Sequence, residues 1–243
     1  MITNTQPSIE QTSNPNCAKP LLGDCAGFQS DVYLMDCMEL MAQYPDNYFD
    51  LAVADVPYGI NESGQTNITR GKRAKSKNYG NKNWDLSAPN FVYFLELKRV
   101  SKNQIIWGAN HFISKIPFDS SCWIVWDKEN GETDFADCEL AWTSFKTAVR
   151  KFKFKWQGML QGDMKNKEFR IHPTQKPVKL YDWIFKNYAT EGMKILDTHL
   201  GSGSSRISAN KANLHFTGCE IDKEYFDKSV NRYDDFVSQV RLF

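Results

Sequence analysis

An apolar run at residues 49–54 ends at Asp55-Val56-Pro57-Tyr58, where three groups of different chemistry follow one another. A carboxylate, a main-chain carbonyl and an aromatic ring at the end of a buried strand are the groups needed to hold a planar base that carries an amino group. The two oxygens would accept the amine hydrogens, and stacking on the ring is typically worth about 1–3 kcal/mol per base. We therefore interpret residues 55–58 as catalytic candidates, with no metal implied.

A second candidate segment is the glycine-rich turn Gly201-Ser202-Gly203, which lies between a predicted strand ending near Asp197 and a predicted helix starting near Ser204. Glycines permit positive φ angles and close approach of a ligand, and the first turn of a helix offers free amides. The next predicted strand ends at Glu220, an offset that suits hydrogen bonding to both hydroxyls of a ribose. No Gly-Lys-Ser/Thr follows, so this is not a phosphate loop, and a plain tight turn stays open as the alternative.

Alternating strands and helices are expected to position both segments. The pattern predicts helices at 88–100, 177–188, 204–212 and 223–237, a short helix around residues 38–41, and strands at 32–35, 51–54, 104–107, 122–126, 137–142, 194–196 and 215–219. This alternation is typical of an α/β fold with a mostly parallel sheet of about seven strands and helices on both faces. Ligands of such sheets bind beyond the carboxyl ends of the strands, where both candidate segments fall.

Composition limits the class of protein. The chain has 243 residues, a net charge of +1 and six cysteines. The cysteines form no Cys-x-x-Cys pair, which indicates reduced thiols of an intracellular protein and no zinc site. The sequence contains no apolar run long enough for a membrane span and no signal peptide. We expect a flexible N-terminal segment at 1–30 and one domain at 31–243.

Positive charge is concentrated in two blocks that contain no acid, within the segments 60–85 and 143–170. Aromatic residues interleave with both blocks, which favours contact with nucleic-acid phosphates over the alternative of two solvated loops. The candidate DNA-binding residues are Arg70, Lys72, Arg73, Lys75, Lys77 and Lys82 in the first block, and Arg150, Lys151, Lys153 and Lys155 in the second.

Four motifs between residues 31 and 238 together resemble one known family, the S-adenosylmethionine-dependent DNA amino-methyltransferases. Its Asp-Pro-Pro-Tyr resembles residues 55–58, its His-Pro-Thr-Gln-Lys-Pro is unchanged at 172–177, its Asp-Pro-Phe-x-Gly-Ser-Gly resembles 197–203, and its Gly-x-Glu-x-x-x-x-Tyr fits 218–225. The catalytic motif precedes the cofactor motif, as in the circularly permuted β group with its Rossmann-like fold. Restriction–modification systems, orphan enzymes and phage-borne or mobile-element enzymes share these features.

The resemblance implies roles for further residues. Glu220 would bind the ribose of S-adenosyl-L-methionine, Asp36 would lie near the adenine, and Asp222 would make a second contact near the ribose. The expected contacts of the methionine moiety are Asp197, His199, Gly201, Ser202, Gly203 and Ser204 on one side, and Thr174, Gln175 and Lys176 on the other. Asp36 is equally suited to cap a helix, and we expect His172 to be a packing residue and not a general base.

Three residues depart from the family pattern. Val56 replaces a proline but keeps the carbonyl, whereas Thr198 and His199 replace Pro-Phe, and His199 would either pack through a polar edge or leave the site looser. Because adenine-N6 enzymes of the family usually have an aspartate where this chain has Asp55, the resemblance implies adenine N6 as the acceptor of the methyl group, in a base flipped out of double-stranded DNA. Cytosine N4, an RNA or protein-amide substrate, and a non-catalytic nucleic-acid-binding protein are the alternatives. A homodimer is left open, and the resemblance implies the cytoplasm of a bacterial or phage-infected cell.

Overall fold

The computed structural model describes residues 28–61, 85–131, 136–157 and 160–240. Its main sheet has eight strands in the order β1-β10-β9-β2-β3-β5-β4-β6. The strands are β1 (Ser30–Leu34), β2 (Phe49–Ala54), β3 (Ser101–Trp107), β4 (Trp123–Asp127), β5 (Cys138–Thr143), β6 (Arg150–Lys153), β9 (Lys194–Asp197) and β10 (His215–Glu220). β5 is antiparallel to β3 and β4, and the other neighbouring pairs are parallel. The prediction of a mostly parallel α/β sheet is therefore confirmed.

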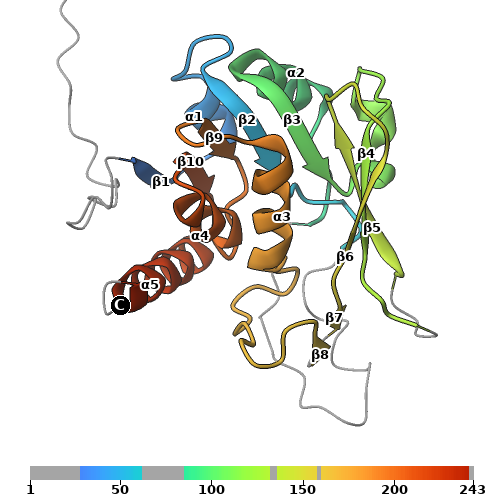
Figure 1. Ribbon diagram of the computed structural model, residues 1–243. Helices are drawn as coiled ribbons and strands as arrows, with labels where there is room; N and C mark the ends of the chain where they lie inside the picture. Colours follow the sequence, from blue (N-terminus) through green and yellow to red (C-terminus); the bar gives the residue numbers. More distant parts are fainter. Residues whose placement is uncertain (1–27, 62–84, 132–135, 158–159, 241–243) are drawn as a thin grey trace, which may run out of the picture.

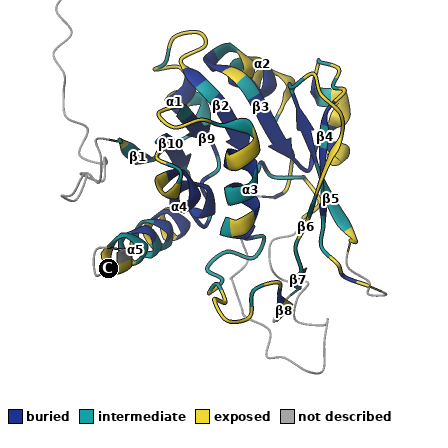
Figure 2. Ribbon diagram, viewed as in Figure 1, coloured by how far each residue is buried: buried dark blue, intermediate teal, exposed yellow. Residues whose placement is uncertain are grey.

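Helices cover both faces of this sheet (Figure 1). The α-helices are α1 (Cys37–Met41), α2 (Phe91–Val100), α3 (Val178–Tyr188), α4 (Ser204–Lys211) and α5 (Lys223–Val240), and two short 3-10 helices, η2 (Ala109–His111) and η3 (Ile113–Lys115), follow β3. Side chains alternate along β2, so that Leu51 and Val53 pack with α3, α4 and α5, whereas Ala52 and Ala54 pack with α1 and α2. The buried central strands in Figure 2 separate these two cores.

Two parts of the fold differ from the sequence-based expectation. The sheet has an eighth strand, β6, and a two-stranded hairpin follows it, formed by β7 (Trp156–Gln157) and β8 (Leu160–Gln161). β6 reads Arg-Lys-Phe-Lys, and only Phe152 packs against the core. Its hydrophobic pattern is too short to reveal a strand, and its pairing with β4 is a tertiary contact. Helix α2 begins at Phe91, later than expected, because the Asn90 side chain caps it.

The order of the strands creates a crevice between β9 and β2. From β2 the chain crosses to β3 on one side, and from β9 it crosses to β10 on the other side. Neighbouring connections that run in opposite directions leave a gap beyond the carboxyl ends of these two strands, which is where ligands of doubly wound sheets bind. Asp55 follows β2 and Asp197 ends β9, so both candidate segments reach this gap. No helix in the described parts of the chain is long and apolar enough to cross a membrane.

Candidate active site

A cleft of about 870 Å³ lies beyond the carboxyl ends of the parallel strands. Its lining includes residues from all four motifs: Asp36, Asp55, Val56, Pro57, Tyr58, Thr174, Gln175, Lys176, His199, Gly201, Ser202, Ser204, Glu220 and Asp222. Asp197 and Gly203, also expected to contact a cofactor, do not line it. Both belong to the turn that shapes the cleft wall. The structure therefore brings segments that are more than a hundred residues apart in the sequence into one cavity.

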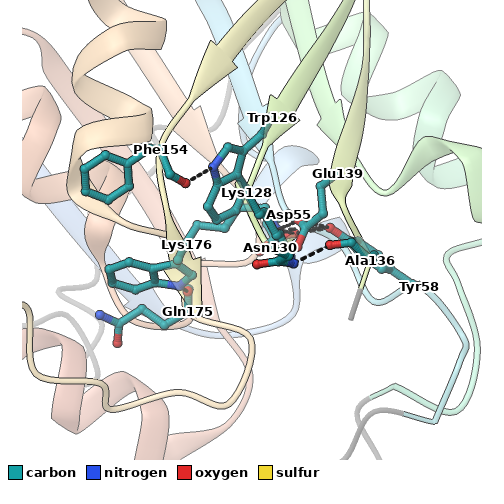
Figure 3. Close-up of polar contacts among 11 residues, drawn as sticks. Asp55, Tyr58, Trp126, Lys128, Asn130, Ala136, Glu139, Phe154, Gln175 and Lys176 are labelled. Carbon is teal, nitrogen blue, oxygen red and sulfur yellow. Dashed lines mark hydrogen bonds and ion pairs between the residues drawn. The ribbon is translucent and has the colours of Figure 1, made fainter. Parts of the chain in front are cut away.

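Charged side chains form a connected network at the catalytic motif (Figure 3). Lys176 forms an ion pair with Oδ1 of Asp55, and its Nζ lies 3.2 Å from Oε2 of Glu139. Lys128 pairs with the other oxygen of Glu139. The Tyr58 hydroxyl donates to Oδ1 of Asp55 at 3.0 Å and accepts from Lys176 at 2.9 Å. Among the described residues, none donates to Oδ2 of Asp55, so this oxygen has acceptor capacity to spare.

The two carboxylates of this network differ in acidity. Burial raises the pKa of Asp55, although Lys176 opposes that shift. Burial also acts on Glu139, but Lys176 and Lys128 together outweigh it and bring its pKa to about 2. Lys176 stays protonated, because Asp55 and Glu139 raise its pKa despite its burial. Asp55 is therefore the more basic carboxylate, since it has one cation beside it, whereas Glu139 has two.

Tyr58 is held in place by its ring as well as by its hydroxyl. The ring stacks on His111, with centroids 5.2 Å apart. Gly108 lies directly against it, and a Cβ there would come within 2.0 Å of the Tyr58 ring. The predicted strand at 104–107 ends just before Gly108, and the structure gives this glycine a steric role in seating the aromatic residue of the site.

Lys176 joins the family's His-Pro-Thr-Gln-Lys-Pro segment to the 55–58 motif. The resemblance implies that it contacts the cofactor, and the structure shows its ammonium group on the Asp55 carboxylate at the cleft, with only 4% of its side chain exposed. Thr174 bonds the ring of His172 at 3.1 Å, and the buried amide of Gln175 accepts from the backbone of Ile171 at 2.9 Å. The His172 ring packs on Tyr225 with centroids 4.2 Å apart. His172 therefore packs on its neighbours, and its ring also lines the cleft.

Pro177 also differs slightly from its predicted position. It was expected in the first turn of the helix, but it has an extended conformation, with ψ of 147°, and stands at the N-cap of α3. The backbone N–H of Val178 then donates to Oε1 of Glu168 at 2.9 Å. The Glu168 carboxylate thus accepts from a free amide at the start of this helix. The Pro177 side chain cannot do so, because it has no hydrogen-bond acceptor.

The glycine-rich turn is held together by Asp197. Its carboxylate accepts from the His199 amide at 3.0 Å and from the Ser205 hydroxyl at 2.5 Å. Gly201 and Gly203 have φ angles of 51° and 70°, values that side chains disfavour. Asp197 is therefore a structural residue of the turn in this conformation. Burial raises its pKa to about 7, and the hydrogen bonds from Ser205 and His199 oppose that rise.

The raised pKa of Asp197 predicts a pH-dependent stability. The folded protein keeps the proton up to about pH 7, whereas the unfolded chain releases it near 3.8. The stabilisation from this group is complete below that lower value and is lost as the pH rises to about 7. The free energy of unfolding of Asp197→Asn, relative to that of the unmodified chain, should therefore increase as the pH is raised from 5 to 7.5. Urea denaturation at each pH measures this difference. A difference between the two proteins that does not change with pH would contradict this.

Three carboxylates lie at the ends of the neighbouring strands β1 and β10. Glu220 accepts from the amides of Gly201, Ile221 and Asp222 at 2.9–3.0 Å, and only one of these bonds, from Gly201, is to Oε2. Asp36 caps α1 through Met38 at 2.7 Å. Asp222 accepts from two amides in the first turn of α5. The capping role considered for Asp36 is confirmed, and all three residues still line the cleft.

The unusual pair Thr198-His199 packs through polar contacts. The Thr198 hydroxyl lies 2.6 Å from the Tyr93 hydroxyl and 3.0 Å from Nδ1 of His199. The His199 ring meets the Tyr93 ring edge-on, with centroids 5.6 Å apart. Burial lowers the pKa of His199 to about 4, so that the ring is neutral at physiological pH. Of the two outcomes that the sequence left open, the structure shows the well-packed one.

The basic residues are only partly described. Arg70, Lys72, Arg73, Lys75, Lys77 and Lys82 lie outside the described residues. In the second block, Arg150, Lys151 and Lys153 are exposed on the edge strand β6, and Lys155 is half-buried. Lys151 and Lys153 each lie near an acid, Asp127 at 3.7 Å and Glu129 at 3.1 Å. Exposed pairs of this kind are weak and are easily exchanged for phosphate.

Sequence reasoning missed Glu139 and Lys128. Both lie on or just after strands, β5 and β4, that were expected only as parts of the sheet. The pairing of β5 between β3 and β4 carries Glu139 to the cleft, where it meets Lys176 from the start of α3. A glutamate within an alternating strand offered a weak signal, because exposed glutamates in strands are common.

The fold and the cleft define a class, the Rossmann-like S-adenosylmethionine-dependent methyltransferases. Two solved structures of that class share the fold: the M1.HpyAVI complex with S-adenosylmethionine, at 20% identity and a TM-score of 0.52, and the PvuII DNA methyltransferase described as cytosine-N4-specific, at 13% identity and a TM-score of 0.55. They cover 84% and 87% of this chain, which in turn covers 98% and 92% of theirs.

The chain belongs to the DNA methylase family of N6/N4 amino-methyltransferases. The model of this family matches residues 96–231, which are more than half of this chain. The Type II methyltransferase M2.MboI of Moraxella bovis is 25% identical, over 86% of this chain and 90% of that protein. The Type II methyltransferase M.BglII of Bacillus subtilis is also 25% identical, over 81% of this chain and 66% of that protein.

Proposed function

We propose that this protein transfers a methyl group from S-adenosyl-L-methionine to the exocyclic N6 of an adenine flipped out of double-stranded DNA. One observation carries the proposal: Oδ1 of Asp55 is occupied by Lys176 and Tyr58, whereas Oδ2 has no partner among the described residues and the carboxylate lines the cleft. A buried carboxylate oriented through one oxygen is suited to accept a hydrogen of an amine through the other.

The residues of the cleft fit the cofactor. An ionised carboxylate has about four acceptor sites, and backbone amides use three of them on Glu220. The remaining site, on Oε2, suits a ribose hydroxyl. Asp36, Asp222, Gly201, Ser202 and Ser204 line the same cleft. We assign the methionine moiety to the side of the glycine-rich turn, with Thr174 and Gln175 on its other side and Asp197 and Gly203 supporting the turn.

Catalysis in this proposal depends on alignment. The lone pair of an exocyclic amine is delocalised into the ring of the base, and hydrogen bonds from its two hydrogens to Oδ2 of Asp55 and the Val56 carbonyl draw the nitrogen toward sp³ geometry. S-adenosyl-L-methionine supplies the electrophilic methyl group. Asp55, with its raised pKa, is suited to take the proton that the amine loses when the new N–C bond forms. Holding the reactants in line in a dry cleft accounts for much of the rate.

Asp55 supports adenine over cytosine, because an aspartate at this position is usual in adenine-N6 enzymes of the family. Cytosine N4 is the second candidate, and the fold of the cytosine-N4-specific PvuII enzyme supports it. Expression in cells that lack DNA methylation, followed by mass spectrometry of nucleosides and long-read mapping, should detect N6-methyladenine at one short sequence. N4-methylcytosine instead would overturn the adenine assignment, and no modified base would overturn the proposed function.

The described part of the chain supports DNA as the substrate through Arg150, Lys151, Lys153 and Lys155. The segment between β5 and α3 is short, and we propose that it reads the DNA together with residues 60–85. A homodimer and an association with a restriction nuclease are compatible with Type II relatives. We propose that the enzyme works in the cytoplasm of a bacterial or phage-infected cell, where its DNA substrate lies.

A further inference from the structure

The rim of the cleft carries an exposed aromatic side chain. Phe169 is 74% exposed, more than any other large hydrophobic residue in the described parts of the chain. Leu160, in β8, and Met164, in the segment between β8 and α3 that also carries Phe169, are 50% and 54% exposed. An exposed aromatic side chain at the rim of a functional cleft is a candidate contact for a partner. Phe169 and its neighbour Lys167 both line the cleft that contains Asp55.

The backbone that carries Phe169 is firmly held. The preceding residue, Glu168, exchanges two hydrogen bonds of 2.8 Å with the buried amide of Gln161. Its carboxylate accepts from Val178 at 2.9 Å and pairs with Arg232 at 2.8 Å. Arg232 also donates to the Ser202 carbonyl at 2.8 Å. Phe169 is therefore exposed at a fixed position that is tied to both the glycine-rich turn and the start of α3.

The charge around Phe169 suits a polyanion. Lys165 and Lys167 are exposed, whereas the negative charge of Glu168 is paired with Arg232. Asp163 is half-buried and holds Asn166 through its backbone and side chain at 3.1 and 3.0 Å. The surface thus presents cations beside an apolar tip. Phosphates of a duplex would meet the lysines, and the apolar tip would meet the base stack.

We propose that Phe169 is a wedge that enters the base stack of DNA and fills the space left by the flipped target base. A base can reach the cleft only if it leaves the helix, which breaks its stacking and its pairing. Proteins commonly insert apolar side chains such as phenylalanine between base steps to stabilise such distortion. Lys165 and Lys167 contact the flanking phosphates. This inference rests on the proposed function and assigns the residue that opens the duplex.

The test compares duplex DNA with DNA in which the base is already unpaired. Phe169→Ala should methylate duplex DNA from methylation-free cells about tenfold or more slowly than the unmodified enzyme, since each 1.4 kcal/mol corresponds to a factor of ten. On a duplex in which the mapped target base lies opposite an abasic site, the rate of Phe169→Ala should be within about twofold of the rate of the unmodified enzyme on the same DNA. Phe169→Trp should restore duplex activity. Fluorescence of 2-aminopurine at the target position should rise with the unmodified enzyme and not with Phe169→Ala.

Phe91→Ala is the matched control, because Phe91 is 48% exposed at the start of α2 and does not line the cleft. It should leave both rates unchanged. The affinity for S-adenosylhomocysteine, measured by calorimetry, should be equal in the unmodified enzyme, Phe169→Ala and Phe91→Ala. Unchanged duplex activity in Phe169→Ala, or an equal loss on both substrates, would overturn the wedge. Absence of methylation by the unmodified enzyme would instead overturn the proposed function.

Discussion

Asp55→Asn is expected to lower the rate of methyl transfer by about 10²–10³-fold, the usual effect of removing one positioned hydrogen-bonding group at a reacting atom. Asparagine keeps the size of the side chain and one acceptor oxygen. It loses the negative charge that pairs with Lys176, and its amide nitrogen cannot accept a hydrogen or a proton. Single-turnover transfer of labelled methyl groups to duplex DNA measures the effect, and cofactor affinity should change little.

Asp50→Asn is the control for this substitution. Asp50 lies at the opposite end of the same strand, where it pairs with Lys102 at 2.7 Å and accepts from the Lys194 amide at 2.9 Å. The same change there should leave the rate within about twofold, because it lies outside the cleft. If Asp55→Asn kept the full rate, the amine-gripping role of the 55–58 motif would be wrong, even though the fold and the family would stand.

Of the substitutions proposed for this protein, Lys176→Met should cause the largest loss in the free energy of unfolding, about 3–5 kcal/mol. A loss of this size is typical when one partner of a buried ion network is removed. Methionine fills a similar volume but leaves Asp55 and Glu139 without the cation between them. Urea denaturation followed by circular dichroism measures the difference. Lys151→Met is the matched control. Its side chain is 58% exposed and lies 3.7 Å from Asp127, so the loss should be at most about 1 kcal/mol.

The same substitution should move the pH dependence of activity. Methyl transfer needs Asp55 ionised, burial raises its pKa, and Lys176 opposes that rise. Without Lys176 the pKa of Asp55 rises further, and the acid limb of the rate–pH profile should shift to higher pH. Activity should therefore recover partly as the pH is raised. Equal stability of Lys176→Met and the unmodified chain, or an unshifted acid limb, would show that the network does not control Asp55.

Much of the site followed from local sequence. Asp55, Glu220 and the Gly201–Gly203 turn were identified because each lies at or just after the end of a strand, and parallel strands end at one edge of a sheet. Periodicity located α3, α4 and α5 because their apolar faces repeat at helical spacing. The strand β6 was missed because its sequence is basic and because only one of its side chains, Phe152, packs on the core.

The sequence by itself determined the class of protein, the order of its motifs and the residues at the strand ends, because these depend on local pattern and on chemical type. Tertiary structure alone decided which charges meet. Lys176 pairs with Asp55 because the segment just before α3 meets the end of β2, 121 residues away in the sequence. Glu139 reaches the same cluster because β5 inserts antiparallel between β3 and β4. Pairing of charges depends on distances of a few ångströms between segments far apart in the chain, and no local pattern encodes those distances.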